Sequence, residues 1–203
     1  MWHRPAPTET MSDSTSTDPR VERTRRAVLD AGAELLSEQG PDGVTHASVA
    51  TQAGVSRTTL YKYWPTRAKL LFDIFSSFHD DSDHTPSGDV RTDLVAMLRE
   101  HQRSMSDPQR RRMFVSMLAQ AQWDADVVEA KSELKAIPLA DLEAVIESGV
   151  VVGIVRTGID PEAAASRLLG PLMFASLVMD DAVLVDVESI VDDWLASVRP
   201  DAG

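Results

Sequence analysis

Apolar residues recur at helical spacing along almost the whole chain, from Val21 to Val198. No stretch shows the alternation of apolar and polar residues that is typical of a strand. Residues spaced three and four apart share one face of a helix, and each helix must bury that face against another. The spacing therefore predicts an all-α protein.

The composition limits where such a protein works. The chain contains no cysteine, which excludes disulfides and thiolate metal sites and favours a reducing compartment, so we expect a cytoplasmic protein. No apolar run approaches the ~18 residues of a membrane span, and we expect no membrane partner. Residues 1–18 lack the apolar centre of a secretion signal and are predicted to form a disordered tail.

The charge is unevenly distributed. The formal net charge is −12, yet residues 20–70 hold eight Lys or Arg against five Asp or Glu. Phosphate contacts need cations, so this segment could meet a polyanion, whereas chance scatter is the alternative interpretation.

Capping and breaking residues divide the first part of the chain. Pro19 is expected to begin a helix, and Gly40 to end it. Thr45 is a plausible N-cap for a short helix to Ala53, but Ser48 stands where a capping box has Glu or Gln.

The next signals follow closely. Gly54 can adopt positive φ, Ser56 caps a third helix, Pro65 ends it and Thr66 caps a fourth. Further along, Pro138 is expected to kink or split a helix over 125–148, and Asp160 to cap a later helix.

Residues 49–64 carry the most specific pattern. Two short helices can cross near a right angle only if apolar, small and glycine residues stand at particular positions. Val49, Leu60 and Trp64 fit the inner faces, and Gly54 fits the turn. The outer face then holds hydrogen-bond donors suited to the major groove of DNA. A helical subdomain that contacts protein is the alternative.

The segment GVSRTTLYKYWPTRAKLL resembles the recognition helix and following helix of TetR-type transcriptional regulators. The resemblance covers roughly residues 20–75. It implies a three-helix DNA-binding domain (19–66) followed by a larger helical domain (67–203) that binds a small-molecule effector and dimerises. We also expect a non-enzymatic protein without cofactor, because the sequence shows no phosphate-binding glycine loop, nucleophile elbow or paired catalytic acids. Our hypothesis is a repressor that the effector releases from a palindromic double-stranded DNA operator by shifting the fourth helix; activation is the alternative. Carried over by position, the residues expected to contact phosphates are Thr45, Tyr61, Tyr63 and Arg67. Those expected to face the groove are Arg57, Thr58, Thr59 and Lys62.

The second domain offers candidate ligand and dimer contacts. Bulky, adaptable side chains could line an internal cavity, although ordinary core packing is the commoner role for each of them. The candidates are Met97, His101, Phe114, Met117, Trp123 and Met173. The last two helices are the expected dimer interface, with stripes at Leu168 to Leu177 and Ile190 to Val198; the alternative is that these stripes close the core of the monomer.

Two other patterns and two other classes of protein need consideration. Residues from His79 to His84 resemble a metal cluster but fit a solvated acidic loop better, and we expect no metal site. Arg110, Arg111 and Arg112 could steer an anion, though a solvated helix start explains them too. The rival classes are a helical interaction module, and a ligand-binding or catalytic protein with a vestigial N-terminal domain.

Overall fold

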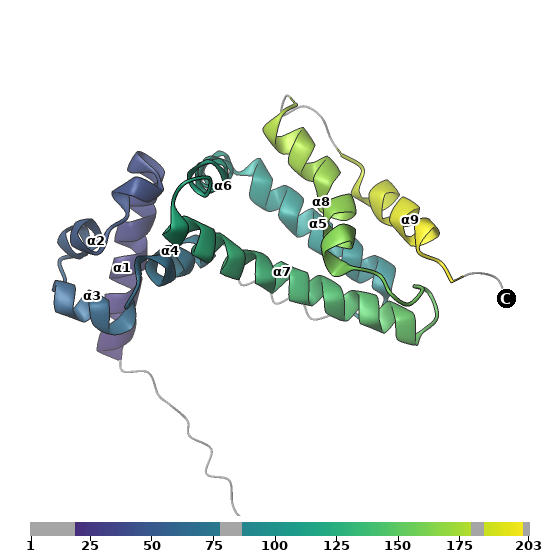
Figure 1. Ribbon diagram of the computed structural model, residues 1–203, viewed down its shortest axis with the longest axis horizontal. Helices are drawn as coiled ribbons and strands as arrows, with labels where there is room; N and C mark the ends of the chain where they lie inside the picture. The colour runs from purple at the N-terminus through teal and green to yellow at the C-terminus, as the bar shows by residue number, and fades with distance from the viewer. Residues whose placement is uncertain (1–18, 78–86, 180–184, 201–203) are drawn as a thin grey trace, which may run out of the picture.

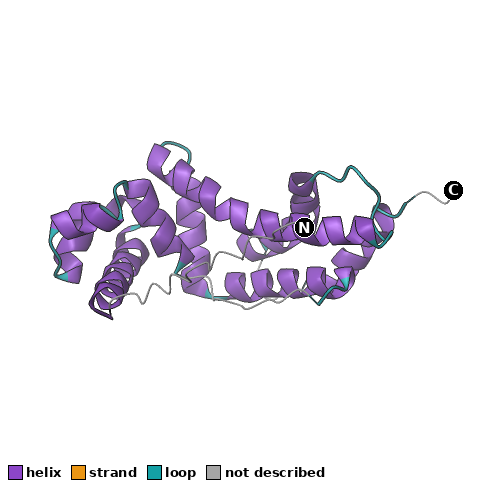
Figure 2. Ribbon diagram, turned by 90° about the horizontal axis from the view of Figure 1, so that it is seen from below, coloured by secondary structure: helices purple, strands orange, loops and turns teal. Residues whose placement is uncertain are grey.

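The computed structural model describes residues 19–77, 87–179 and 185–200. In these ranges the chain forms α-helices, one short 3₁₀ turn and connecting loops, without any strand (Figure 2). The all-α prediction is confirmed. The predicted tail of residues 1–18 lies outside the described residues.

The helices form two groups joined by a long one (Figure 1). The first group is α1 (Pro19–Gln39), η1 (Pro41–Gly43, the 3₁₀ turn), α2 (His46–Ala53), α3 (Arg57–Tyr63) and α4 (Arg67–Ser76). The remaining helices are α5 (Val90–Ser106), α6 (Pro108–Gln120), α7 (Ala125–Val151), α8 (Pro161–Leu177) and α9 (Val187–Ser197). In Figure 1, α1 to α4 occupy one end of an elongated molecule, and α7 runs from α4 toward α8.

Side-chain caps determine where the helices begin. From α2 to α9, a Ser, Thr or Asp side chain accepts a hydrogen bond from a backbone N–H of the first turn. The predicted caps Thr45, Ser56, Thr66 and Asp160 are confirmed. Ser48 completes a capping box, because its hydroxyl accepts from the N–H of Thr45 at 3.0 Å. A serine thus replaces the Glu or Gln usual at this position.

The helix ends follow the breaking residues in part. Gly54 closes α2 with φ 65°, in the left-handed region that favours glycine. In contrast, Pro138 does not split α7, which continues to Val151. Proline removes one backbone hydrogen bond, but Leu134 before it and Leu142 after it pack into apolar clusters that hold both halves of the helix.

The first core joins α1 to α4 with α6 and the beginning of α7. Its α4 residues include Leu70, Leu71 and Ile74, all fully buried. The expected domain boundary after residue 66 therefore separates α4 from helices with which it shares a core. Other members of the first core are Val28, Leu35, Leu36, Val49, Leu60, Trp64, Phe75, Met113, Met117, Ala121, Val127 and Ala130.

The second core lies at the other end of α7. It is formed by α5, the later part of α7, α8 and α9, and its members include Val90, Leu94, Leu98, Leu142, Val145, Ile146, Leu168, Leu172, Val191, Trp194 and Val198. Since α7 contributes to both cores, it links the two groups, as does α6, which contacts α1 as well as α5 and α8.

Candidate DNA-binding interface

Helix α3 has one buried face and one exposed face. Leu60 and the adjoining Trp64 are buried in the first core, and burial of each such side chain contributes roughly 1.5–3 kcal/mol. Ser56 caps the helix by accepting a hydrogen bond from the N–H of Thr59 at 3.1 Å. Short as it is, α3 is therefore held by its inner face and by its cap.

The outer face of α3 carries the residues expected to contact DNA. Arg57, Thr58, Tyr61, Lys62 and Tyr63 are exposed. Thr59 is half-buried, and its hydroxyl shares a hydrogen bond of 2.8 Å with that of Ser56. The Lys62 ammonium lies 5.3 Å from the centre of the Tyr63 ring, a cation–π contact. Polar groups and a positive charge thus gather on one side of the helix.

A histidine that the sequence did not single out supports this face. The ring of His46 is buried and stacks on the ring of Tyr61. His46 Nε2 lies 2.7 Å from the backbone oxygen of Trp64, and since that oxygen can only accept, Nε2 carries the proton. His46 therefore ties the start of α2 to the end of α3. Its position next to the cap Thr45 was the available signal.

Thr45 lies exposed immediately before His46. Its hydroxyl accepts a hydrogen bond from the N–H of Ser48 at 3.1 Å. The Ser48 hydroxyl in turn donates to the carbonyl of Gly43 at 2.6 Å. The cap therefore fixes Thr45 beside the ring pair that supports α3.

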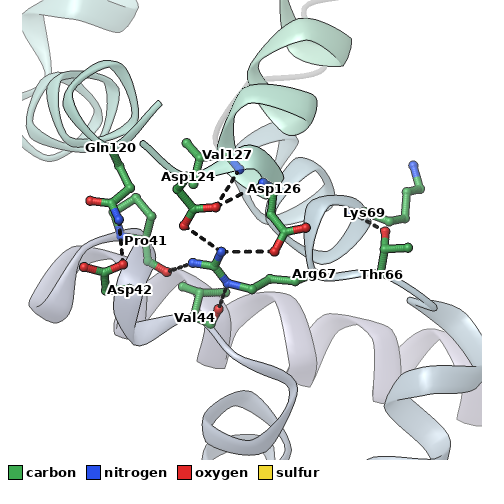
Figure 3. Close-up of polar contacts among 10 residues, drawn as sticks. All are labelled: Pro41, Asp42, Val44, Thr66, Arg67, Lys69, Gln120, Asp124, Asp126 and Val127. Atoms are coloured by element: carbon green, nitrogen blue, oxygen red, sulfur yellow. Dashed lines mark hydrogen bonds and ion pairs between the residues drawn. The ribbon is translucent and has the colours of Figure 1, made fainter. Parts of the chain in front are cut away.

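Arg67 has different partners from those expected. Its guanidinium is largely buried and lies against the carbonyls of Pro41 and Val44 and the carboxylates of Asp124 and Asp126 (Figure 3). All three nitrogen atoms of the guanidinium have partners within the protein. Arg67 therefore does not belong with the exposed residues of α3.

The structure does not bring the six expected effector contacts together. His101 Nε2 lies 3.0 Å from the sulfur of Met173, and Met97 packs against the second core. Phe114 and Met117 belong with the first core instead, on the helix that packs against α1 and η1. Trp123 is 71% exposed in the turn after α6. The six residues therefore do not gather at one site.

An open groove lies between α6 and the end of α8. Its volume is about 400 Å³. Its lining combines two arginines with apolar and hydroxyl side chains: Arg111, Arg112, Val115, Ser116, Ser176 and Leu177. The basic run noted in the sequence thus contributes to a concave surface.

The stripes expected to form the dimer interface are mostly inside the chain. Leu168 and Leu172 of α8 meet Trp194 of α9 in the second core. Large apolar side chains nevertheless remain exposed at the end of α8, among them Phe174, 58% exposed, and Val178, 65% exposed, which directly follows the helix. The buried residues of these stripes therefore fit the alternative, in which the stripes close the core of the monomer. Another side of α8, which carries Phe174, remains exposed to solvent.

Within the described ranges, no helix combines the length and apolarity that crossing a membrane requires. The same part of the chain holds no group of three His, Asp or Glu placed to bind a metal ion. The sequence cluster from His79 to His84 lies outside the described residues.

Comparisons with known proteins match both groups of helices. Residues 28–74 match the family described as "Bacterial regulatory proteins, tetR family", and residues 85–193 match "Tetracyclin repressor-like, C-terminal domain". The chain is 28% identical to an uncharacterized HTH-type transcriptional regulator, YdeS, of Bacillus subtilis, over 81% of this chain and 84% of that protein.

Solved structures agree. The TetR family transcription regulator SCO0332 is 32% identical, with a TM-score of 0.66 over 88% of this chain and 100% of that chain. The fold also resembles FadR of Bacillus subtilis in complex with stearoyl-CoA, 19% identical, with a TM-score of 0.56 over 84% of this chain and 95% of that one. The expectation of a regulator and not an enzyme is confirmed by these relatives. The chain belongs to the TetR family of helix-turn-helix transcriptional regulators.

Proposed function

We propose that the protein is a repressor that binds a near-palindromic operator as a homodimer and is released by a small-molecule effector. The observation that carries the proposal is the division of α3 into a buried apolar face and an exposed polar face with two cations, Arg57 and Lys62. A short helix of this kind fits the major groove, where its first residues meet base edges and its flanks meet phosphates.

Each exposed residue then has a role set by its position. Arg57 and Thr58 begin α3 and would meet base edges, with Thr59 beside them. Lys62 and Tyr63 at the end of the helix would contact phosphates. Tyr61 and Thr45, held together through His46, would contact the backbone of the same strand.

The dimer is proposed to form through α8 and α9, with the uncovered side of α8 at its centre. Phe174 and Val178 expose apolar surface on this side, whereas the outer side of α9 presents Asp192 and Asp193 to solvent. Two subunits related by a two-fold axis would place their α3 helices ~34 to 36 Å apart, one turn of DNA. Phe174→Asp should therefore give monomers in sedimentation equilibrium, whereas Val151→Asp, at another exposed position, should not.

The effector is proposed to be an anionic amphiphile in the groove between α6 and α8. Arg111 and Arg112 offer positive charge beside the apolar Val115 and Leu177, and FadR, of similar fold, is described with stearoyl-CoA. An effector that favours the non-binding state must lower DNA affinity by the ratio of its affinities for the two states. Stearoyl-CoA should therefore displace operator from the protein, and less effectively from Arg112→Gln. Unchanged operator affinity at saturating stearoyl-CoA contradicts this assignment.

Selection of bound fragments from genomic DNA gives the operator and tests the proposal directly. Binding to the selected duplex should fall steeply with salt, because each phosphate contact releases counterions. Arg57→Ala should lose preference among operator sequences, and Lys62→Ala should reduce the salt slope by about one.

Arg156→Ala is the matched control, since it removes an exposed arginine in the loop after α7. Binding equal to wild type in both α3 variants would contradict the assigned helix. A monomer with no preference among duplexes at low salt would contradict the whole proposal.

A further inference from the structure

Arg67 uses all three of its side-chain nitrogen atoms within the protein (Figure 3). Nε donates to the carbonyl of Val44 at 2.8 Å, and Nη2 donates to the carbonyl of Pro41 at 2.7 Å. Nη1 donates to Asp124 at 2.8 Å and lies 3.4 Å from Asp126. The carbonyls belong to the turn before α2, and the carboxylates to the start of α7. One side chain therefore joins the DNA-binding helices to α7.

Asp124 performs two tasks at once. Its Oδ1 caps α7 by accepting from the N–H groups of Asp126 and Val127 at 3.0 and 3.3 Å, while Oδ2 accepts from Arg67. Partial burial raises the pKa of Asp124. The hydrogen bond and charge of Arg67, together with the two N–H groups, lower the pKa by more than burial raises it. The net pKa lies below its ordinary 3.8, so the carboxylate is charged at neutral pH.

The pair is shielded and geometrically specific. The side chains of Arg67 and Asp124 are only 18% and 17% exposed. Gln120 at the end of α6 adds a second link by donating to Asp42 at 2.6 Å. Val127 is fully buried in the first core next to this site. Apolar burial is non-directional, whereas a forked guanidinium adds geometric specificity to the contact between α4 and α7.

The other end of α7 belongs to the second core. Leu142, Val145 and Ile146 are buried there against α5, α8 and α9. The orientation that Arg67 fixes at the start of α7 is therefore carried along one continuous helix to the part of the chain that holds the groove and the proposed dimer face.

We propose that Arg67 is a positioning residue: with Asp124 it fixes the orientation of the DNA-binding helices against α7, and so the spacing of the two α3 helices in the dimer. The effect on operator spacing rests on the proposed function. Disruption of this pair keeps the apolar residues of both cores but loosens the angle between the first group of helices and α7.

A phosphate contact by Arg67 is the competing role, and substitutions separate the two. Arg67→Lys keeps a cation for phosphate but loses the planar fork that reaches carbonyls and carboxylate together. Asp124→Asn keeps the cation and a capping side chain but removes the charge that holds Arg67. Arg91→Gln is the matched control, because it breaks the exposed Arg91–Asp192 ion pair between α5 and α9.

The first measurement needs no DNA. The chain has no cysteine, so cysteines placed at the exposed positions Thr51 of α2 and Glu147 of α7 take spin labels uniquely. Pulsed electron–electron double resonance reports the distribution of distances between the two labels, and so between the two groups of helices. The labelled protein is diluted with unlabelled protein. We expect it to broaden in Arg67→Lys and Asp124→Asn but not in Arg91→Gln. Unchanged distributions in folded Asp124→Asn and Arg67→Lys overturn the proposal.

The second measurement uses the selected operator with its half-site spacing changed by one base pair. Asp124→Asn and Arg67→Lys should each reduce discrimination against altered spacing by about tenfold, a typical coupling between sites. The double variant should lose no more than either single variant, and binding to one half-site should stay as in wild type. Two results together overturn the proposal: Asp124→Asn discriminates against altered spacing as fully as wild type, and Arg67→Gln lowers the salt dependence of operator binding. They would show that Arg67 contacts a phosphate instead. If wild type binds no duplex, the proposed function fails, and the distance measurement alone decides the positioning role.

Discussion

The rings of His46 and Tyr61 stack in parallel, with centroids 4.2 Å apart and planes inclined by 13°. His46 is buried and hydrogen-bonded to the carbonyl of Trp64, whereas Tyr61 is 53% exposed. A rigid buried ring thus carries an exposed one, which limits the rotamers that Tyr61 can adopt before DNA arrives. Affinity for DNA is higher when the side chains that bind it are already ordered in the free protein.

This pair predicts energetic coupling in operator binding. His46→Ala removes both the stacking and the hydrogen bond, so it should weaken binding although His46 itself is buried. In a double-mutant cycle with Tyr61→Leu, we expect a coupling of about 0.5–1.5 kcal/mol, the range for aromatic pairs. Fluorescence anisotropy on the operator measures it. Thr51→Ala, at an exposed position of α2, is the control, and strictly additive losses contradict the coupling.

The capping box at α2 predicts a loss of stability. Ser48→Ala removes the hydrogen bonds from the N–H of Thr45 and to the carbonyl of Gly43. Loss of a cap costs about 1 kcal/mol in the free energy of unfolding. Urea unfolding followed by circular dichroism should show this loss for Ser48→Ala and nearly none for Gln122→Ala, an exposed residue after α6. Equal stability of Ser48→Ala and wild type would mean that water replaces these bonds without cost.

Local signals in the sequence were enough to predict where several helices begin and which side of α3 is buried. Ser56, Thr66 and Asp160 cap the helices expected of them, because a side-chain oxygen beside free backbone N–H groups acts within three residues. The buried Leu60 and Trp64 follow from spacing alone. Both kinds of signal depend on neighbours along the chain.

Contacts between residues far apart in the chain could not be predicted from the sequence. Arg67 finds Asp124 across 57 positions of the chain, and no spacing rule connects them. The stripe of α8 marks an apolar face, but periodicity cannot tell whether α9 of the same chain or another subunit covers it. Met117 and Met173 have the same chemistry yet pack in different places, so residue type alone could not assemble an effector site.

Pro138 predicts a gain of stability on substitution. It lies exposed within α7, between the residues that belong to the first core and those that belong to the second. Pro138→Ala restores a backbone donor inside the helix and should raise the free energy of unfolding, by up to about 3 kcal/mol. The neighbouring exposed Ala136 offers the opposite control, since Ala136→Gly should lower it by about 1 kcal/mol. Guanidinium unfolding measures both, and a Pro138→Ala variant less stable than wild type would contradict the prediction.

The lowered pKa of Asp124 predicts how its contribution depends on pH. A carboxyl group whose pKa is lower in the folded state than in the unfolded state binds fewer protons when folded, so it stabilises the fold above its ordinary value. That contribution is complete above about pH 5 and is lost as the pH falls through 3.8 and below. Asp124→Asn should therefore melt below wild type at pH 7, and the gap between their melting temperatures should close as the pH falls from 5 to 3. Other carboxyl groups titrate in both proteins and cancel in this difference. A gap that stays constant down to pH 3 would contradict an ionised Asp124 as the partner of Arg67, because the difference would then come from packing alone.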